Sequence, residues 1–163
     1  MGVQFASKMG MEVTAVSSSA DKAALCKELG AHYFLNTSDS KDAQAFNSGQ
    51  FDIILNTGLA HNLQPIINAL RKGGYLLQVG LPDASKPLSF EHMPTVCSQK
   101  TIVGGYIGNR ESMESMLKFA KLHNIYPMVE MFSFEDFPKA YHRMAHEKPH
   151  FRVVVDVQSY LEK

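Results

Sequence analysis

The chain has 163 residues, 45% of them hydrophobic, and its 16 basic and 16 acidic side chains give a formal net charge of zero. That length provides for a substantial core, while the balanced charge argues against a nucleic-acid-binding surface, and no apolar run approaches the roughly 18 residues of a membrane span. The N-terminus lacks a signal-peptide pattern, and the two cysteines, Cys26 and Cys97, form no CxxC motif, which predicts free thiols and a cytoplasmic location.

Helical and strand patterns alternate along the whole chain. Strands are predicted where β-branched and other apolar residues run together, and helices where apolar residues recur on one face. The predicted helices are 2–9, 19–29, 39–46, 59–70, 110–123 and 138–145, and the predicted strands are 12–16, 32–35, 51–55, 75–79, 100–103, 128–132 and 151–157. This alternation predicts an α/β fold, a Rossmann-type doubly wound parallel sheet.

One part of that sheet is not accounted for. In the strand order 3-2-1-4-5-6, strand 1 lies in the middle of the sheet and is followed by a glycine-rich loop. The first predicted element of this chain is the helix that comes after both. The sequence therefore predicts a sheet without its first strand and glycine-rich loop, with an unpaired strand on each side of the gap. Two explanations remain open: the chain is a fragment, or another segment fills the gap.

The segment Ser17–Lys22 follows the first predicted strand and is the first candidate site. In a dinucleotide fingerprint, the residue that contacts the adenosine ribose lies about 20 positions after the first glycine, and NAD-binding proteins have an acid there. If Gly2 is the third glycine of that fingerprint, this position falls near Ser17. Hydroxyl groups and the ammonium of Lys22 suit a 2′-phosphate, so the segment favours NADP. The alternative interpretation is a serine-rich helix cap with a solvated lysine.

Longer motifs extend across the chain. Met-Gly-Val-Gln-Phe-Ala-Ser-Lys-Met-Gly begins at residue 1, Val-Thr-Ala-Val-Ser-Ser-Ser at 13, Phe-Asp-Ile-Ile-Leu-Asn-Thr at 51, Gly-Tyr-Ile-Gly at 105 and Phe-Arg-Val-Val-Val-Asp at 151. With these motifs in order, the chain resembles the nucleotide-binding half of the medium-chain, zinc-type alcohol dehydrogenases. The nearest branch is the cinnamyl-alcohol-dehydrogenase type, which uses NADP.

The resemblance implies a set of cofactor-binding residues. They are Gly2 in the pyrophosphate loop, Ser17, Ser18, Ser19, Ala20, Asp21 and Lys22 in the 2′-phosphate pocket, Thr57 and Gly80 along the cofactor, Gly105, Tyr106 and Ile107 at the carboxamide, and Arg152 near the cofactor. It also implies two domains. Residues 1–150 would form an N-terminally incomplete NADP-binding domain, and residues 151–163 a strand and tail that return toward a catalytic domain.

The family holds its catalytic zinc with Cys, His or Glu, and Cys from a separate catalytic domain, and this chain contains neither those residues nor the four-cysteine structural zinc loop. We therefore predict no catalytic residue and no metal ligand here, weak or absent NADPH binding by the chain alone, and no alcohol oxidation. A complete relative would transfer hydride between NADP(H) and a small alcohol or aldehyde. The resemblance also implies a homodimer that pairs through 86–90. The alternative function is a catalytically inactive nucleotide-binding remnant or interaction module.

Three histidines, His142, His146 and His150, recur every four residues near the C-terminus. The first two would share one face of a helix, which is a spacing that can ligate a metal ion. Pro149 ends that helix before the third histidine, and no cysteine lies nearby. The pattern favours a solvated helix face, with a metal site as the alternative.

Overall fold

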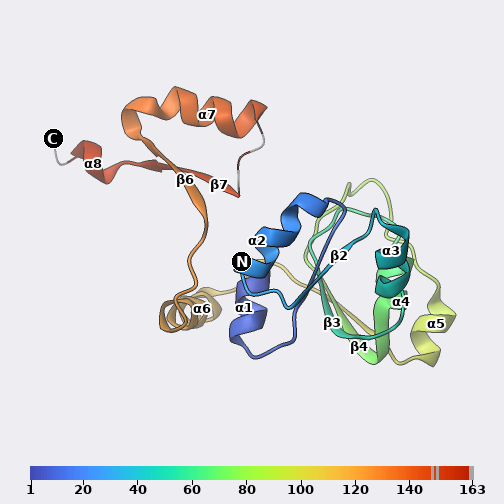
Figure 1. Ribbon diagram of the computed structural model, residues 1–163. Helices are drawn as coiled ribbons and strands as arrows, with labels where there is room; N and C mark the ends of the chain where they lie inside the picture. Colours follow the sequence, from blue (N-terminus) through green and yellow to red (C-terminus); the bar gives the residue numbers. More distant parts are fainter. Residues whose placement is uncertain (148, 150, 162–163) are drawn as a thin grey trace. The chain divides into compact units, whose positions relative to one another are not determined.

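The computed structural model describes residues 1–147, 149 and 151–161, so that His150 lies outside the described residues. The chain divides into two compact units, Gly2–His123 and Asn124–Lys163, and Met1 is grouped with the second. Figure 1 shows the elements of both units coloured in chain order. The predicted domain division at residue 150 concerns the whole protein and stays a prediction.

The first unit alternates helices with strands. Its helices are α1 (Gly2–Lys8), α2 (Ala23–Glu28), α3 (Ser40–Phe46), α4 (Gln64–Ala69), α5 (His92–Cys97) and α6 (Arg110–Leu122), and the 3₁₀ turn η1 (Ala20–Lys22) precedes α2. Its strands are β1 (Thr14–Ser17), β2 (Tyr33–Asn36), β3 (Phe51–Asn56), β4 (Leu70–Gln78) and β5 (Thr101–Gly104). Every pair among these strands is parallel, which confirms the predicted α/β class.

The five strands form two separate sheets, β1–β2 and β3–β4–β5. Among the described strands, β1 pairs only with β2, and β3 only with β4. This is the arrangement expected of a Rossmann sheet that lacks its first strand, because that strand would lie between β1 and β3. Apolar side chains of these two strands are accordingly open to solvent: Val16 is 42% exposed, Ile53 46% and Leu55 49%. The predicted unpaired strand on each side of the gap is confirmed.

Helix α1 contacts both sheets. On one side, Val3 and Ala6 pack against the cluster formed by Val13, Ala15 and Ala31. On the other side, Gly2 lies against β3, where a Cβ on this glycine would come within 3.1 Å of Leu55 Cδ2. The first helical residue is thus held beside β3 close to the carboxyl end of that strand.

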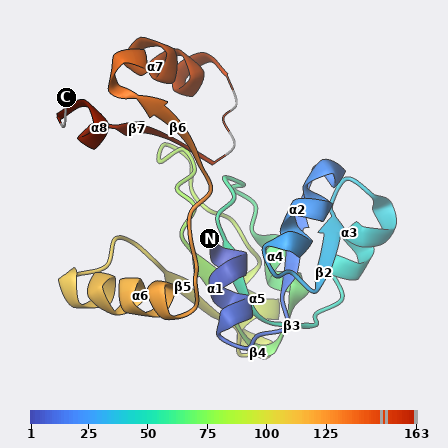
Figure 2. The ribbon, with the colours of Figure 1, turned by 60° about the vertical axis from the view of Figure 1, so that its left-hand side comes forward.

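The larger core lies between α4 and the three-stranded sheet. Its members are fully or almost fully buried, and they are Leu63, Ile67, Leu70 and Leu76, with Ile54, Ile66 and Ile102 packed around them. Ile67 comes from α4, Leu63 immediately precedes that helix, and Leu70 and Leu76 belong to β4. Around the other sheet, α2 and α3 lie on opposite sides of β2 (Figures 1 and 2), as in a doubly wound fold.

Helix α4 begins at Gln64, five residues later than the predicted helix 59–70. The Asn62 side chain accepts a hydrogen bond from the Gln64 N–H over 3.0 Å, and the Ser89 carbonyl accepts one from the Leu63 N–H over 2.9 Å. Ser89, from the segment expected at a dimer interface, also forms an isolated bridge with Asn62. This pairing with a distant segment holds the chain out of helical conformation until Gln64.

The second unit contains β6 (Val129–Ser133), the 3₁₀ turn η2 (Phe134–Asp136), α7 (Phe137–His146), β7 (Arg152–Asp156) and α8 (Gln158–Leu161). Strands β6 and β7 are parallel and in register from Val129–Arg152 to Ser133–Asp156, with α7 as their connection (Figure 2). Among the described helices of both units, none combines the length and the apolar character that crossing a bilayer requires.

Candidate functional site

Three of the predicted site segments follow three neighbouring strands. Thr57 comes directly after β3, Gly80 lies two residues after β4, and Gly105 comes directly after β5. Because the strands are parallel and adjacent, their carboxyl ends lie at one edge of the sheet, which is where open α/β sheets bind ligands. The sheet therefore brings together these three residues and the adjoining Tyr106 and Ile107.

The backbones at this edge approach each other closely. A Cβ on Gly80 would lie 2.1 Å from the carbonyl oxygen of Gly58 and 2.9 Å from the carbonyl carbon of Thr57. A Cβ on Gly105 would lie 2.8 Å from Val79 Cγ1. Only glycine fits at the first of these positions without displacing backbone, so main chain packs on main chain between the loops that follow β3 and β4. A flat ring or a phosphate can approach such a surface closely.

Two polar side chains at the same edge were not predicted as site residues. Asn56, the last residue of β3, is 8% exposed, and its Nδ2 donates to Gln78 Oε1 of β4 over 2.6 Å. A sequence signal existed, because each residue is a polar amide that directly follows a run of apolar residues, 53–55 before Asn56 and 75–77 before Gln78. Their importance depends on the register between the strands, which places Asn56 opposite Gln78.

The side chains of Tyr106 and Ile107, at the same edge, are exposed to solvent. Tyr106 is 81% exposed and Ile107 is 76% exposed, so their side chains are free to contact a bound molecule. The Gly105 N–H donates a hydrogen bond to the Gln78 carbonyl over 2.9 Å, which fixes the position of the first residue of this loop. Gly2 reaches the same strand through its contact with Leu55.

The segment Ser17–Lys22 leaves the carboxyl end of β1 in the other sheet. Ser17 Oγ accepts a hydrogen bond from the Ser19 N–H over 3.2 Å, and Ser18, Ala20 and Lys22 are exposed. Ser19 occupies the predicted N-cap position of η1 but makes no capping bond; its hydroxyl donates to Asp21 Oδ1 instead.

That hydrogen bond lowers the pKa of the Asp21 carboxyl, so Asp21 is ionised at neutral pH. An anion therefore stands beside the lysine expected to bind phosphate.

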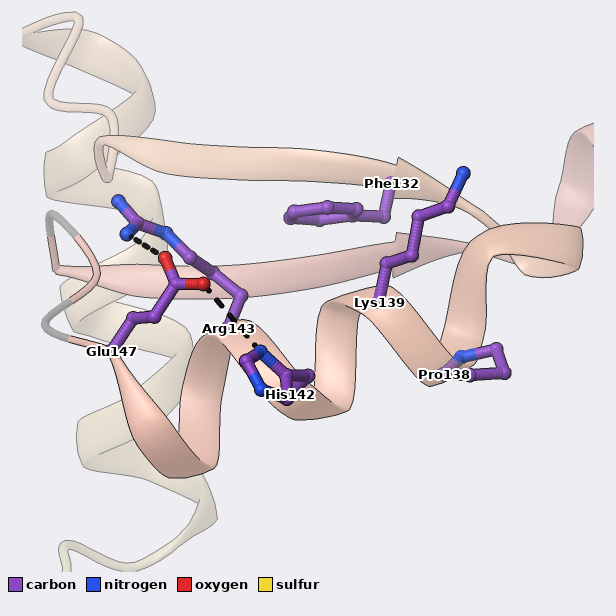
Figure 3. Close-up of a pocket in the computed structure, with 6 residues that line it drawn as sticks. All are labelled: Phe132, Pro138, Lys139, His142, Arg143 and Glu147. Carbon is purple, nitrogen blue, oxygen red and sulfur yellow. Dashed lines mark hydrogen bonds and ion pairs between the residues drawn. The ribbon is translucent and has the colours of Figure 1, made fainter.

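Arg152 belongs to the second unit, as the exposed first residue of β7. Its predicted part in the cofactor site stays a prediction. The same unit contains a wide, open hollow of about 460 Å³, lined by Phe132, Pro138, Lys139, His142, Arg143 and Glu147 (Figure 3).

The cations of this hollow already have partners. Lys139 Nζ lies 2.6 Å from Asp136 Oδ1, and Arg143 donates to Glu130 Oε2 over 2.7 Å and to Glu147 Oε2 over 2.5 Å. Figure 3 shows Glu147 between Arg143 and His142, and His142 Nδ1 lies 3.5 Å from Glu147 Oε1. The hollow therefore has the charges of a self-contained ion-pair network rather than of an anion-binding site.

The two described histidines of the predicted helix face are adjacent on α7. The His142 and His146 rings have centroids 4.9 Å apart, and both residues are exposed. Within residues 1–147, 149 and 151–161, no three His, Cys, Asp or Glu side chains gather as a metal site.

Arg143 controls the ionisation of Glu147. Its hydrogen bond lowers the pKa of Glu147, so the pair stabilises the second unit above the ordinary carboxyl pKa and stops doing so as the pH falls through the lowered value. We expect Arg143→Met to return the pKa of Glu147 toward its usual range, as measured by NMR titration of the carboxyl carbon. Arg110→Met is the matched control, since Arg110 forms a similar pair with Glu114 on α6. An unchanged Glu147 titration in Arg143→Met would contradict the assignment.

Comparison with known proteins identifies the family. The family model described as zinc-binding dehydrogenase matches residues 1–121. A probable formaldehyde dehydrogenase of Bacillus subtilis is 33% identical over 160 residues, which cover 98% of this chain and 45% of that protein. A probable cinnamyl alcohol dehydrogenase of Arabidopsis thaliana is 32% identical over 163 residues, which cover 99% of this chain and 44% of that protein. The chain thus spans less than half the length of these relatives.

Solved structures agree with the sequence matches. A cinnamyl alcohol dehydrogenase from Sorghum bicolor superposes with a TM-score of 0.83 at 30% identity, over 96% of this chain and 44% of the other. The cinnamyl alcohol dehydrogenase of Helicobacter pylori complexed with NADP(H) gives 0.77 at 27% identity, over 97% of this chain and 44% of the other. The resemblance read from the motifs is confirmed: the chain belongs to the zinc-binding dehydrogenase family and has the Rossmann-like nucleotide-binding fold of its alcohol dehydrogenases.

Proposed function

We propose that this chain is the NADP(H)-binding part of a zinc-dependent alcohol dehydrogenase. The observation that carries the proposal is the main-chain edge formed by Thr57, Gly80 and Gly105, where Gly80 is packed so closely on Gly58 that no larger residue fits. Glycines at these strand ends support the proposal, because a flat ring can approach the backbone of a glycine without an intervening side chain. When bound, the nicotinamide supplies the hydride acceptor or donor.

The preference for NADP rests on the other sheet. Ser17, Ser18 and Ser19 offer hydroxyl groups and Lys22 offers an exposed ammonium at the carboxyl end of β1. These groups suit a 2′-phosphate, while Asp21 opposes it. The Helicobacter pylori relative, which is described as complexed with NADP(H), supports the same cofactor for this chain.

The substrate is proposed to be a small alcohol or aldehyde, since the relatives bear the names of formaldehyde and cinnamyl alcohol dehydrogenases. In this proposal the catalytic zinc and its ligands belong to a separate catalytic domain, and this chain orients the cofactor toward it. A homodimer and a cytoplasmic location remain part of the proposal.

An NMR titration tests cofactor binding residue by residue. We expect NADPH, added to the ¹⁵N-labelled chain at concentrations suited to weak binding, to shift the amide signals of 17–22, Gly58, Gly80 and 105–107, and NADH to shift the first group less. Adenosine 2′,5′-bisphosphate, which carries the phosphorylated ribose without nicotinamide, should shift the first group alone. Shifts confined to the second unit, or shifts of 17–22 that are equal for NADPH and NADH, would refute the proposal.

The second candidate is a nucleotide-binding module without catalysis. The two candidates differ in the coding sequence upstream of Met1. The enzyme requires a glycine-rich loop and zinc-ligand motifs in the same reading frame, whereas the module requires neither.

A further inference from the structure

A continuous chain of hydrogen bonds joins the ends of β3 and β4 through the side chains of Asn56 and Gln78. The Gly58 N–H donates to Asn56 Oδ1 over 3.0 Å, Asn56 Nδ2 donates to Gln78 Oε1 over 2.6 Å, and Gln78 Nε2 donates to the Gly80 carbonyl over 2.8 Å. None of these bonds belongs to the ladder of the sheet. They connect the loops of Thr57 and Gly80.

The backbone groups of Gly58 and Gly80, at the two ends of this series of hydrogen bonds, determine which side-chain atoms donate and which accept. Gly58 contributes an N–H, so Asn56 must turn its oxygen toward Gly58 and its amino group toward Gln78. Gly80 contributes a carbonyl, so Gln78 must turn its amino group toward Gly80 and its oxygen toward Asn56. Both side chains therefore need a donor as well as an acceptor, which an ionised carboxylate does not provide.

The main chains of the same two residues hold the remaining loops. The N–H groups of Val79 and Gly80 both donate to the Asn56 carbonyl over 3.0 Å. The Gly105 N–H donates to the Gln78 carbonyl over 2.9 Å. Two residues thus fix the first positions of all three loops at this edge of the sheet.

We propose that Asn56 and Gln78 are positioning residues for the nicotinamide half of the cofactor. This inference rests on the proposed function. The pair orders the loops of Thr57, Gly80 and Gly105 before the ring arrives, so that binding does not bear the entropic cost of ordering them. The segment 17–22, proposed for the 2′-phosphate, takes no part in this series of hydrogen bonds. We therefore expect binding at that segment to be unaffected when the series is broken.

Asn56→Asp is the sharpest variant, because it keeps the size of the side chain and the acceptor for Gly58 but loses the donor to Gln78. We expect the Kd of NADPH to rise about tenfold and that of adenosine 2′,5′-bisphosphate to stay unchanged, both measured by NMR titration. Asn68→Asp is the matched control, with the same charge change at an exposed amide whose oxygen only accepts a hydrogen bond, from Gln64. It should change neither Kd.

A second variant and a second measurement guard against simple misfolding. Gln78→Met introduces no charge, removes both side-chain bonds and should give the same selective loss of NADPH affinity. In both variants, amide hydrogen exchange at Gly80 and Gly105 should accelerate relative to the core residue Leu76. Equal weakening of both ligands, or an unchanged Kd for NADPH, overturns the positioning role while the proposed function stands.

Failure of the proposed function gives a different result. In that case any shifts that NADPH produces in the unsubstituted chain lie outside 17–22, Gly58, Gly80 and 105–107, and the assignment of this pair to a cofactor falls with them. Unchanged exchange at Gly80 and Gly105 in the variants overturns the claim that the pair orders these loops, whatever the ligands do.

Discussion

Gly80→Ala is expected to destabilise the first unit by about 3 kcal/mol, because the new Cβ would meet backbone that has no room to move. It would lie 2.1 Å from the Gly58 carbonyl oxygen and 2.9 Å from the carbonyl carbon of Thr57. To relieve that contact, the loops after β3 and β4 must separate, which breaks the bonds from the Val79 and Gly80 N–H groups to Asn56. Equilibrium unfolding in urea measures the loss as a lower midpoint.

Gly104→Ala is the matched control for this prediction. Gly104 is the last residue of β5, and a Cβ there would meet nothing within 4 Å. Neither glycine has a positive φ, so the two substitutions differ in crowding and not in backbone strain. We expect Gly104→Ala to leave the midpoint unchanged or raise it slightly, since alanine restricts the unfolded chain. Equal midpoints for the two variants would show that the close approach at Gly80 does not constrain the fold.

The positions of most strands could be predicted from local sequence. Val13, Thr14 and Val16 favour a pleated strand, and the apolar run that begins at Phe51 predicts a second strand. The structure places β1 and β3 within two residues of those predictions. Such strands are recognisable because their own side chains carry the β-propensity.

Features that depend on distant partners could not be predicted in this way. Helix α4 begins five residues after its predicted start because Ser89 pairs with the residues just before it. The sequence near Leu59 contains no pattern that predicts this contact. Helix α5, at His92–Cys97, was not predicted at all, since its short sequence has little apolar period.

The candidate site shows the same division. The glycines that follow the strands are visible in sequence, because a glycine at the end of an apolar strand indicates close approach of another group. The Asn56–Gln78 pair is visible only once the register of β3 on β4 is known. The unpaired strands on each side of the gap were predictable, since topology alone requires them.

Lys22→Ala is expected to weaken NADPH binding by about 1–3 kcal/mol, the usual worth of a hydrogen bond to a charged group, and to leave NADH binding nearly unchanged. Lys22 is exposed at the start of α2, where its ammonium is available to a 2′-phosphate that NADH lacks. NMR titrations with both cofactors measure the difference. Lys27→Ala, which removes an exposed lysine from the last turn of the same helix, should affect the two cofactors equally.

A substitution of Asp21 shows whether the weaker NADPH binding of Lys22→Ala comes from the lost charge or from damage to the loop. The Ser19 hydroxyl lowers the pKa of this carboxyl, so Asp21 presents a negative charge beside Lys22 at neutral pH. If residues 17–22 contact the phosphate, Asp21→Asn removes a repulsion and should tighten NADPH binding, while Lys22→Ala weakens it. Damage to the loop would weaken binding in both variants and would not distinguish NADPH from NADH. If Asp21→Asn strengthens NADPH binding and Lys22→Ala weakens it, and neither changes NADH binding, the ligand must carry a negative group at this end of β1.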